Sequence, residues 1–180
     1  MWWKMDKTID YYNQNADAFA SGTKDVEFTE VQDKFLSYLP FDAYILDFGC
    51  GSGRDAKYFL SKGLQVDATD GSEKLCKIAE KVAGIPVKRM LFYELGEAEK
   101  YDGIWACSSI LHLPKDELKD VMEKMIRATK NGGYIYTSIK YGESVYSVRC
   151  QLLLDMNAID YDNHTATDLS CTICCGQNWW

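Results

Sequence analysis

The sequence predicts an α/β domain in which helices cover both faces of a mostly parallel β-sheet. Three observations lead to this fold class. Apolar segments of strand length alternate with amphipathic segments of helix length from residue 8 to about residue 140. Alternate glycines, Gly49, Gly51 and Gly53, follow the first strand, and an acidic residue, Asp70, ends the second. A chain of 180 residues is long enough for one such domain and too short for two ordinary ones.

The expected helices are marked by apolar residues at helical spacing and by end signals. In the last one, Leu118, Met122 and Met125 share a face, and Pro114 precedes its first turn. Ser72 is a suitable N-cap for the helix that follows it. Asn131 and the two glycines after it are expected to end the last helix. The expected helices span residues 8–20, 29–39, 54–62, 72–82 and 115–129.

The expected strands alternate with these helices and span residues 44–48, 64–69, 87–92, 103–107 and 134–139. This order is typical of a Rossmann-like sheet, in which ligands bind at the carboxyl ends of the strands. The glycine run, Asp70 and the segment 107–109 all fall at such ends. The topology therefore predicts one binding site made from all three.

The glycine run and Asp70 together indicate a nucleoside site. Glycine allows a sharp turn and leaves no Cβ in the way of a ligand, and the helix that follows directs free N–H groups toward it. An acid at the end of the second strand can accept both hydroxyls of a ribose. The spacing here is Gly-x-Gly-x-Gly, and Arg54 stands where a dinucleotide fingerprint has its third glycine. Asp47, two residues before the run, would repel a pyrophosphate but suits an ammonium or sulfonium group.

Several segments resemble successive motifs of class I S-adenosylmethionine-dependent methyltransferases, in particular the small-molecule branch that includes the tellurite-resistance and ubiquinone-type enzymes. The resemblance covers about residues 8–140 and then stops. The segments that carry it are Tyr11 to Phe19, Ile45 to Asp55, Asp70, Tyr101 to Pro114 and Asn131 to Tyr136.

The resemblance implies S-adenosylmethionine as cofactor and assigns residues to it. Asp47 and the loop from Gly49 to Gly53 would hold the methionine part, and Asp70 the ribose. Apolar Leu91 or Phe92 would hold the adenine ring. The implied cofactor-binding residues are Tyr12, Asp47, Gly49, Cys50, Gly51, Gly53, Asp70, Gly71, Leu91, Phe92, Cys107 and Ser108.

Each of three side chains near this site can have one of two roles. Tyr12 either packs the first helix down or closes over the donor, as a tyrosine does in relatives. His112 is the one plausible general base, but a structural role that bridges loops is favoured. Arg54 is either a solvated residue at the start of a helix, which is favoured, or the partner of a carboxylate.

The predicted function is methyl transfer from S-adenosylmethionine to a small-molecule acceptor. The alternatives are a non-catalytic S-adenosylmethionine-binding domain that lacks its substrate-side strands and, less favoured, a nicotinamide-dependent oxidoreductase. A net charge of -7 and the absence of basic clusters argue against nucleic acid as a partner. No signal peptide or membrane span is expected, so the predicted location is cytoplasmic, without membrane partners. The acceptor and the oligomeric state are left open.

The last forty residues differ from the rest. Residues 1–140 read as the methyltransferase domain, and residues 141–180 as its divergent tail, with C-terminal strands that are either truncated or divergent in sequence. Four of the seven cysteines crowd into this tail, namely Cys150, Cys171, Cys174 and Cys175. Cys171 and Cys174 have the spacing of a zinc half-site, but no second pair or histidine follows them, and no metal is expected.

Overall fold

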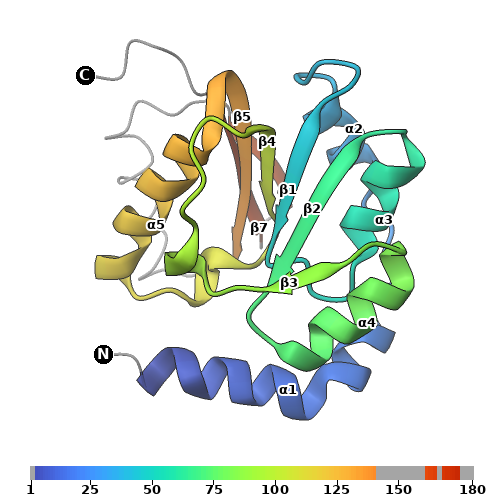
Figure 1. Ribbon diagram of the computed structural model, residues 1–180, viewed down its shortest axis with the longest axis vertical. Coiled ribbons are helices and arrows are strands. Elements are labelled where there is room, and N and C mark those ends of the chain that lie inside the picture. The colour runs from blue at the N-terminus through green and yellow to red at the C-terminus, as the bar shows by residue number, and fades with distance from the viewer. Residues whose placement is uncertain (1–2, 141–160, 166–167, 175–180) are drawn as a thin grey trace.

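The protein is a seven-stranded sheet flanked by helices, as seen in a computed structural model that describes residues 3–140, 161–165 and 168–174 (Figure 1). The strand order is β3-β2-β1-β4-β5-β7-β6. The strands are β1 (Tyr44–Phe48), β2 (Gln65–Asp70), β3 (Val87–Arg89), β4 (Tyr101–Ala106), β5 (Thr129–Lys140), β6 (Tyr161–Thr165) and β7 (Asp168–Cys174). The first five pair in parallel, and β7 pairs antiparallel with β5 and β6. The predicted fold class is confirmed.

The helices are α1 (Trp3–Thr23), α2 (Thr29–Leu36), α3 (Arg54–Ser61), α4 (Glu73–Ala83) and α5 (Lys115–Ala128). Two short 3-10 helices, η1 (Phe92–Glu94) and η2 (Ile110–His112), follow β3 and β4. Figure 1 shows α5 on one side of the sheet, α2, α3 and α4 on the other, and α1 across one end. Among the residues that the structure describes, no helix is both long and apolar enough to cross a membrane.

Each face of the sheet has its own core because successive residues of a buried strand point to opposite sides. On the α5 face, Leu46 and Ile104 pack with Met122 and Met125. On the other face, Trp105 stacks on Tyr136 with 3.9 Å between the ring centroids. The methionines of α5 are therefore core residues.

Several expected boundaries need correction. α1 extends beyond the expected residues 8–20 at both ends, and α2 ends at Leu36, before the expected residue 39. β3 ends at Arg89, because the Leu91 N–H donates to Glu94 Oε2 (2.7 Å) and the chain turns into η1 instead of staying extended. α5 ends at Ala128, and Asn131 and its glycines lie inside β5, which begins five residues earlier than predicted, where Thr129 pairs with Tyr101.

The C-terminal strands are also clearer than the sequence suggested. β7 aligns with β5 over seven residue pairs and β6 pairs with β7, so two further strands continue the sheet beyond β5. Cys171 and Cys174 lie in β7, whereas Cys150 and Cys175 lie outside the described residues. Within the described part, no group of three or more His, Cys, Asp or Glu side chains is placed to hold a metal ion.

Candidate active site

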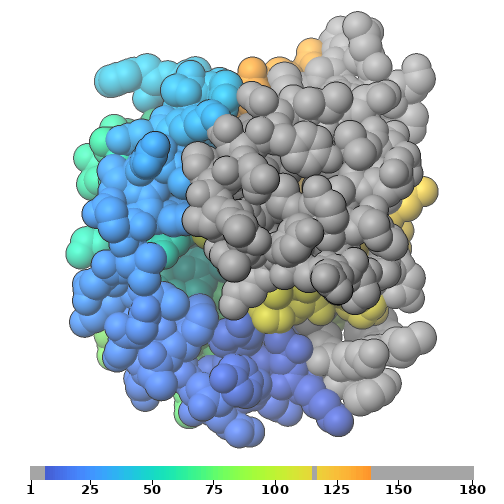
Figure 2. All heavy atoms as spheres, turned by 180° about the vertical axis from the view of Figure 1, so that it is seen from behind, coloured from blue at the N-terminus to red at the C-terminus, as the bar shows by residue number. Residues whose placement is uncertain are grey.

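A cavity of about 510 Å³ lies at the carboxyl ends of β1, β2 and β4. Its wall combines the glycine loop after β1, the end of β2, the segment after β4 and one face of α1. Seen from behind, the N-terminal residues, in blue, occupy the left and the bottom of the molecule (Figure 2). The cavity is bounded by the strand ends on one side and by α1 on the other.

Asp70 ends β2, and backbone N–H groups hold its carboxylate in place. Its Oδ2 accepts a hydrogen bond from the Gly51 N–H (2.9 Å), and its Oδ1 accepts one from the Ser72 N–H (2.8 Å). Burial raises the pKa of this carboxyl, although the backbone N–H groups partly offset the effect. Each carboxylate oxygen can accept more than one hydrogen bond, so Asp70 can also bind hydroxyls of a ligand in the cavity.

Two glycines of the loop are required by close contacts. Gly49 has φ +83°, and a Cβ there would lie 2.4 Å from the Ser109 Cβ. Gly53 has φ +80° and forms the N-cap of α3, where a Cβ would lie 2.9 Å from the Ala79 Cα. The loop therefore passes directly against α4 on one side and the β4 end on the other, which positions it as the cavity floor.

Most of the predicted residues meet at this cavity. Those that line it are Tyr12, Gly49, Cys50, Gly51, Asp70, Gly71, Leu91, Phe92, Cys107, Ser108 and His112. Asp47 and Gly53 do not. The Asp47 side chain is buried within the fold and accepts a hydrogen bond from the Ala56 N–H (3.0 Å), so it caps the start of α3. Burial and the nearby Asp55 raise the pKa of Asp47 well above its usual value. Asp47 and Gly53 thus support the loop from behind and do not form the wall.

The two aromatic residues over the cavity mouth are joined to one another. The Tyr12 hydroxyl lies 2.9 Å from His112 Nε2, which links α1 to η2. The rings meet edge to face with 5.5 Å between their centroids, and Tyr12 also packs against Phe19. Burial, then the charge of Asp70, raise the pKa of Tyr12. The geometry supports the bridging role that was favoured for His112.

The segment after β4 is strained and tied to β5. Ser108 has φ +50°, which is uncommon for a residue with a Cβ. Its N–H donates to Ser138 Oγ (2.7 Å), and the Ser138 hydroxyl in turn donates to Cys107 Sγ (3.6 Å). Burial raises the pKa of the Cys107 thiol to about 12, so the thiol stays protonated near neutral pH.

A network around Asp55 was not predicted. The Arg54 guanidinium donates to the Asp55 carboxylate from Nε (2.8 Å) and Nη2 (2.9 Å). Gln32 Nε2 (2.6 Å) and Trp105 Nε1 (3.0 Å) donate to the same carboxylate. The expectation of a solvated Arg54 is wrong, because its side chain is only 20% exposed and is paired. The signal that could have found the network is a charged pair directly after the glycine loop, at a buried helix start.

These features fit S-adenosylmethionine. A carboxylate at the β2 end suits a ribose, and a glycine floor leaves room for a chain that lies on it. Leu91 and Phe92 offer apolar surface beside Asp70, and Phe92 is itself held edge to face on Phe48 at 4.9 Å. The described residues therefore offer a surface for each part of S-adenosylmethionine: the ribose, the adenine ring and the methionine chain.

A family model described as a methyltransferase domain matches residues 45–133, which include the glycine loop, Asp70 and the β4 end. The resemblance to class I methyltransferases is confirmed. A curated relative, phosphoethanolamine N-methyltransferase 3 from Arabidopsis thaliana, is 29% identical over 120 residues. That match covers 59% of this chain and 24% of the relative, so the chain spans about a quarter of the relative's length.

Solved structures show the same fold. The 1,6-didemethyltoxoflavin-N1-methyltransferase of Burkholderia thailandensis superposes with a TM-score of 0.78 at 16% identity, over 97% of this chain and 88% of that one. The magnesium protoporphyrin IX methyltransferase of Synechocystis gives 0.73 at 16% identity, over 95% and 96%. The [4+2]-cyclase SpnF gives 0.63 at 17% identity, over 74% and 58%. A fold shared with a cyclase fixes no reaction by itself.

Proposed function

We propose that this protein binds S-adenosylmethionine and transfers its methyl group to a small-molecule acceptor. The observation that carries this proposal is the Asp70 carboxylate, held by two backbone N–H groups at the edge of the cavity where a ribose would lie. The glycine loop next to it and the match of residues 45–133 to a methyltransferase domain support the same conclusion.

The chain's own residues have mainly a positioning task in this reaction. When bound, S-adenosylmethionine supplies a methyl group already activated on a positively charged sulfur. Asp70 holds and orients the sugar, the loop from Gly49 to Gly51 supports the chain, and Leu91 and Phe92 keep water from the ring. Holding two reactants in line can supply about 7–11 kcal/mol of the barrier, so a protein nucleophile is not required.

His112 is the catalytic residue predicted from the sequence, and in this proposal its first task is structural. Its Nε2, bonded to the Tyr12 hydroxyl, holds α1 at the cavity mouth. The same atom can take an acceptor proton once that bond opens, which makes His112 a candidate base for acceptors that must lose one.

The acceptor is proposed to be a small molecule because α1 bounds the cavity on one side. Among the lining residues that the structure describes, Arg54 is the one arginine or lysine. Nucleic acid and membranes are not expected as partners, and the cytoplasm is the proposed location. Residues 1–140 form the proposed catalytic domain, with residues 141–180 as its divergent tail.

Calorimetric titration with S-adenosylmethionine, S-adenosylhomocysteine and NAD⁺ tests the proposal. Micromolar binding of the first two and none of NAD⁺ is expected. NAD⁺ binding without S-adenosylmethionine binding would favour the oxidoreductase alternative. Donor binding without release of S-adenosylhomocysteine in a screen of amine, hydroxyl, thiol and chalcogen oxyanion acceptors would favour a non-catalytic domain.

A further inference from the structure

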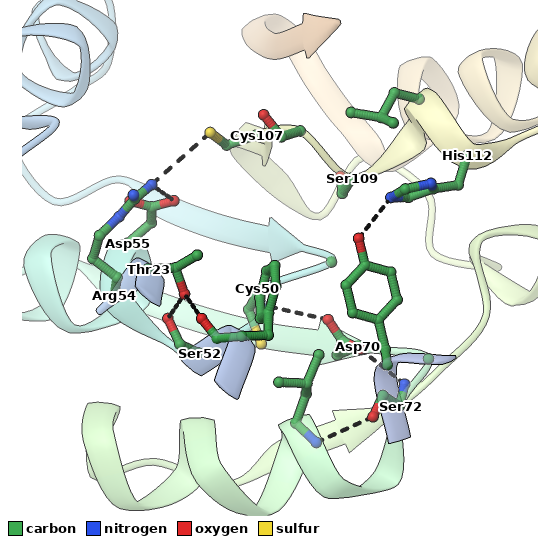
Figure 3. Close-up of a pocket in the computed structure, with 18 of the residues that line it drawn as sticks. Thr23, Cys50, Ser52, Arg54, Asp55, Asp70, Ser72, Cys107, Ser109 and His112 are labelled. Carbon is green, nitrogen blue, oxygen red and sulfur yellow. Dashed lines mark hydrogen bonds and ion pairs between the residues drawn. The ribbon is translucent and has the colours of Figure 1, made fainter. Parts of the chain in front are cut away.

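The two ends of the cavity differ in chemistry. Asp70 marks the end where the nucleoside of the proposed donor lies, and Figure 3 shows Arg54 and Asp55 together at the other end. The Arg54 guanidinium carbon lies 5.0 Å from the centroid of the Phe28 ring, which also lines the cavity. The wall therefore becomes apolar on the far side of the charged pair.

Apolar and aromatic side chains from the start of α2 and from β5 form this part of the wall. We call it the apolar compartment, and its residues are Val26, Phe28, Val31 and Tyr136. The fully buried Trp105 holds both rings: Tyr136 stacks on it with 3.9 Å between the centroids, and Phe28 meets it edge to face at 6.1 Å. Both rings are thus positioned before a ligand arrives, so little side-chain entropy is lost on binding.

Packing of the core does not account for all of this apolar surface. Phe28 and Val31 pack against the core on the α2 face of the sheet but are only partly buried, and both line the cavity. Val26 also lines the cavity and is 49% exposed. Apolar surface at a cavity wall contributes binding free energy when a ligand removes it from water. The compartment therefore favours a ligand with an apolar surface of its own.

The charges of the cavity also limit what the apolar compartment can hold. In the described part of the wall, the acidic and basic side chains other than His112 are Asp70, Arg54 and Asp55. Arg54 and Asp55 neutralise one another, with 2.8 Å between Nε and Oδ1. A charged group that entered the compartment would lose its hydration and find no counter-ion there. The group bound in the compartment is therefore expected to be uncharged.

The donor does not supply such a group at this end, because its methionine part carries an ammonium and a carboxylate. We infer that the apolar compartment binds an uncharged aromatic group of the methyl acceptor, and that Val26 and Phe28 determine this specificity. The inference rests on the proposed function, since it assigns the compartment to the second substrate of that reaction. In the alternative, these residues only pack α2 against the sheet.

The test uses 2-naphthol and 2-naphthyl phosphate, which share an aromatic ring system and differ in charge. Calorimetry is done on protein saturated with S-adenosylhomocysteine, so that the donor side is occupied. Wild-type protein should bind 2-naphthol at least about 10-fold more tightly than the phosphate. Phe28→Ala and Val26→Asp should each weaken 2-naphthol binding about 5- to 10-fold. Phe41→Ala, which removes a ring that is 95% exposed and lies outside the cavity wall, should leave it unchanged.

Val26→Asp covers the case in which Phe28→Ala does not fold, because Val26 is half exposed. Equal binding of the two probes, no binding of 2-naphthol, or full affinity in folded Val26→Asp would overturn the inference. Wild-type protein that does not bind S-adenosylhomocysteine would instead refute the proposed function. Binding of 2-naphthol to that protein, weakened in Val26→Asp, would still assign the compartment to an aromatic ligand.

Discussion

At the Asp70 end of the cavity, backbone N–H groups hold the carboxylate, whereas at the Arg54 end side chains from separate elements hold the guanidinium. Asp70 accepts hydrogen bonds from the N–H of Gly51, in the loop after β1, and from the N–H of Ser72, two residues further along the chain. Arg54 depends on Asp55, which in turn depends on Gln32 of α2 and Trp105 of β4. The first arrangement needs only the loop after β1 to meet the end of β2, and the second forms only when α2, α3 and β4 pack together.

This difference determines what a substitution does. Gly51, Asp70 and Ser72 line the cavity, so water can replace the Asp70 carboxylate on the two backbone N–H groups, and loss of Asp70 should weaken ligand binding and change stability little. A buried network of side chains leaves unpaired partners when one member is removed, so loss of Asp55 should affect stability first.

The largest effect is expected from Asp55→Ala. It leaves Arg54, Gln32 and the Trp105 N–H without their acceptor, and breaking a buried charge pair in this way costs about 3–5 kcal/mol of unfolding free energy. Urea unfolding followed by circular dichroism measures it. Asp33→Ala, which removes an exposed carboxylate from α2, should shift the midpoint little. Equal midpoints for the two variants would show that the network contributes nothing to stability.

Gly53→Ala should be the next most harmful, and it tests how the loop is supported. A left-handed backbone costs a residue with a Cβ about 1–2 kcal/mol. Overlap with Ala79 adds roughly 1–2 kcal/mol at this position only. Gly63→Ala is the matched control, because Gly63 has φ +83° with no atom within 4 Å of the added Cβ. Equal losses in thermal unfolding would mean that α4 moves away and does not constrain the loop.

The fold was predictable wherever local pattern decides. β1 has the expected bounds, and Ser72 caps α4 by accepting a hydrogen bond from the Leu75 N–H, as its residue type suggested. β5 begins earlier than expected because pairing with β4 outweighs the helix-ending tendency of the glycines near residue 132. Such pairing joins residues far apart in the chain and leaves no local signal.

The residues of the site also differ in whether a local pattern or long-range packing determines their position. Asp70 and the loop were predicted because their spacing alone implies the geometry. The Arg54–Asp55 pair was visible as adjacent charges, but its burial depends on Trp105, fifty residues later. The position of Asp47 behind the loop could not be predicted for a related reason. A carboxylate next to a glycine loop can face the ligand or cap α3, and only packing selects between them.

Asp70→Ala should weaken the binding of S-adenosylhomocysteine by about 1–3 kcal/mol, the cost of leaving ribose hydroxyls without a partner. Isothermal titration calorimetry measures the change in affinity. The unfolding midpoint of Asp70→Ala should stay unchanged, in contrast to that of Asp55→Ala. Asp70→Asn, which keeps the shape but not the charge, should lose less. Full affinity in folded Asp70→Ala would remove Asp70 from the ribose site.

Asp47→Asn should change how stability depends on pH. The raised pKa of Asp47 means that the folded state binds its proton more tightly than the unfolded state does. This contribution is fully present below about pH 4 and is lost as pH rises through the folded pKa, with a slope of at most about 1.4 kcal/mol per pH unit. The variant should lose that part of the slope and keep the part due to Asp70, whose pKa is also raised. The free energy of unfolding is measured at several pH values for the wild-type protein and for Asp47→Asn. The same pH dependence in both proteins would contradict the assignment of this slope to Asp47.

The smallest effect is expected from Tyr12→Phe, which removes one hydroxyl and keeps the ring on Phe19. Loss of the hydrogen bond to His112 should weaken S-adenosylhomocysteine binding by about 0.5–1.5 kcal/mol, mainly through faster dissociation, because α1 is then less firmly held over the cavity. His112→Gln should reproduce the faster dissociation if the hydrogen bond is what matters. Stopped-flow displacement measures both rates. A fast rate in Tyr12→Phe alone would assign the effect to a direct contact between the Tyr12 hydroxyl and the ligand. That contact would place Tyr12 with Asp70 among the groups that bind the donor, not among those that close the cavity.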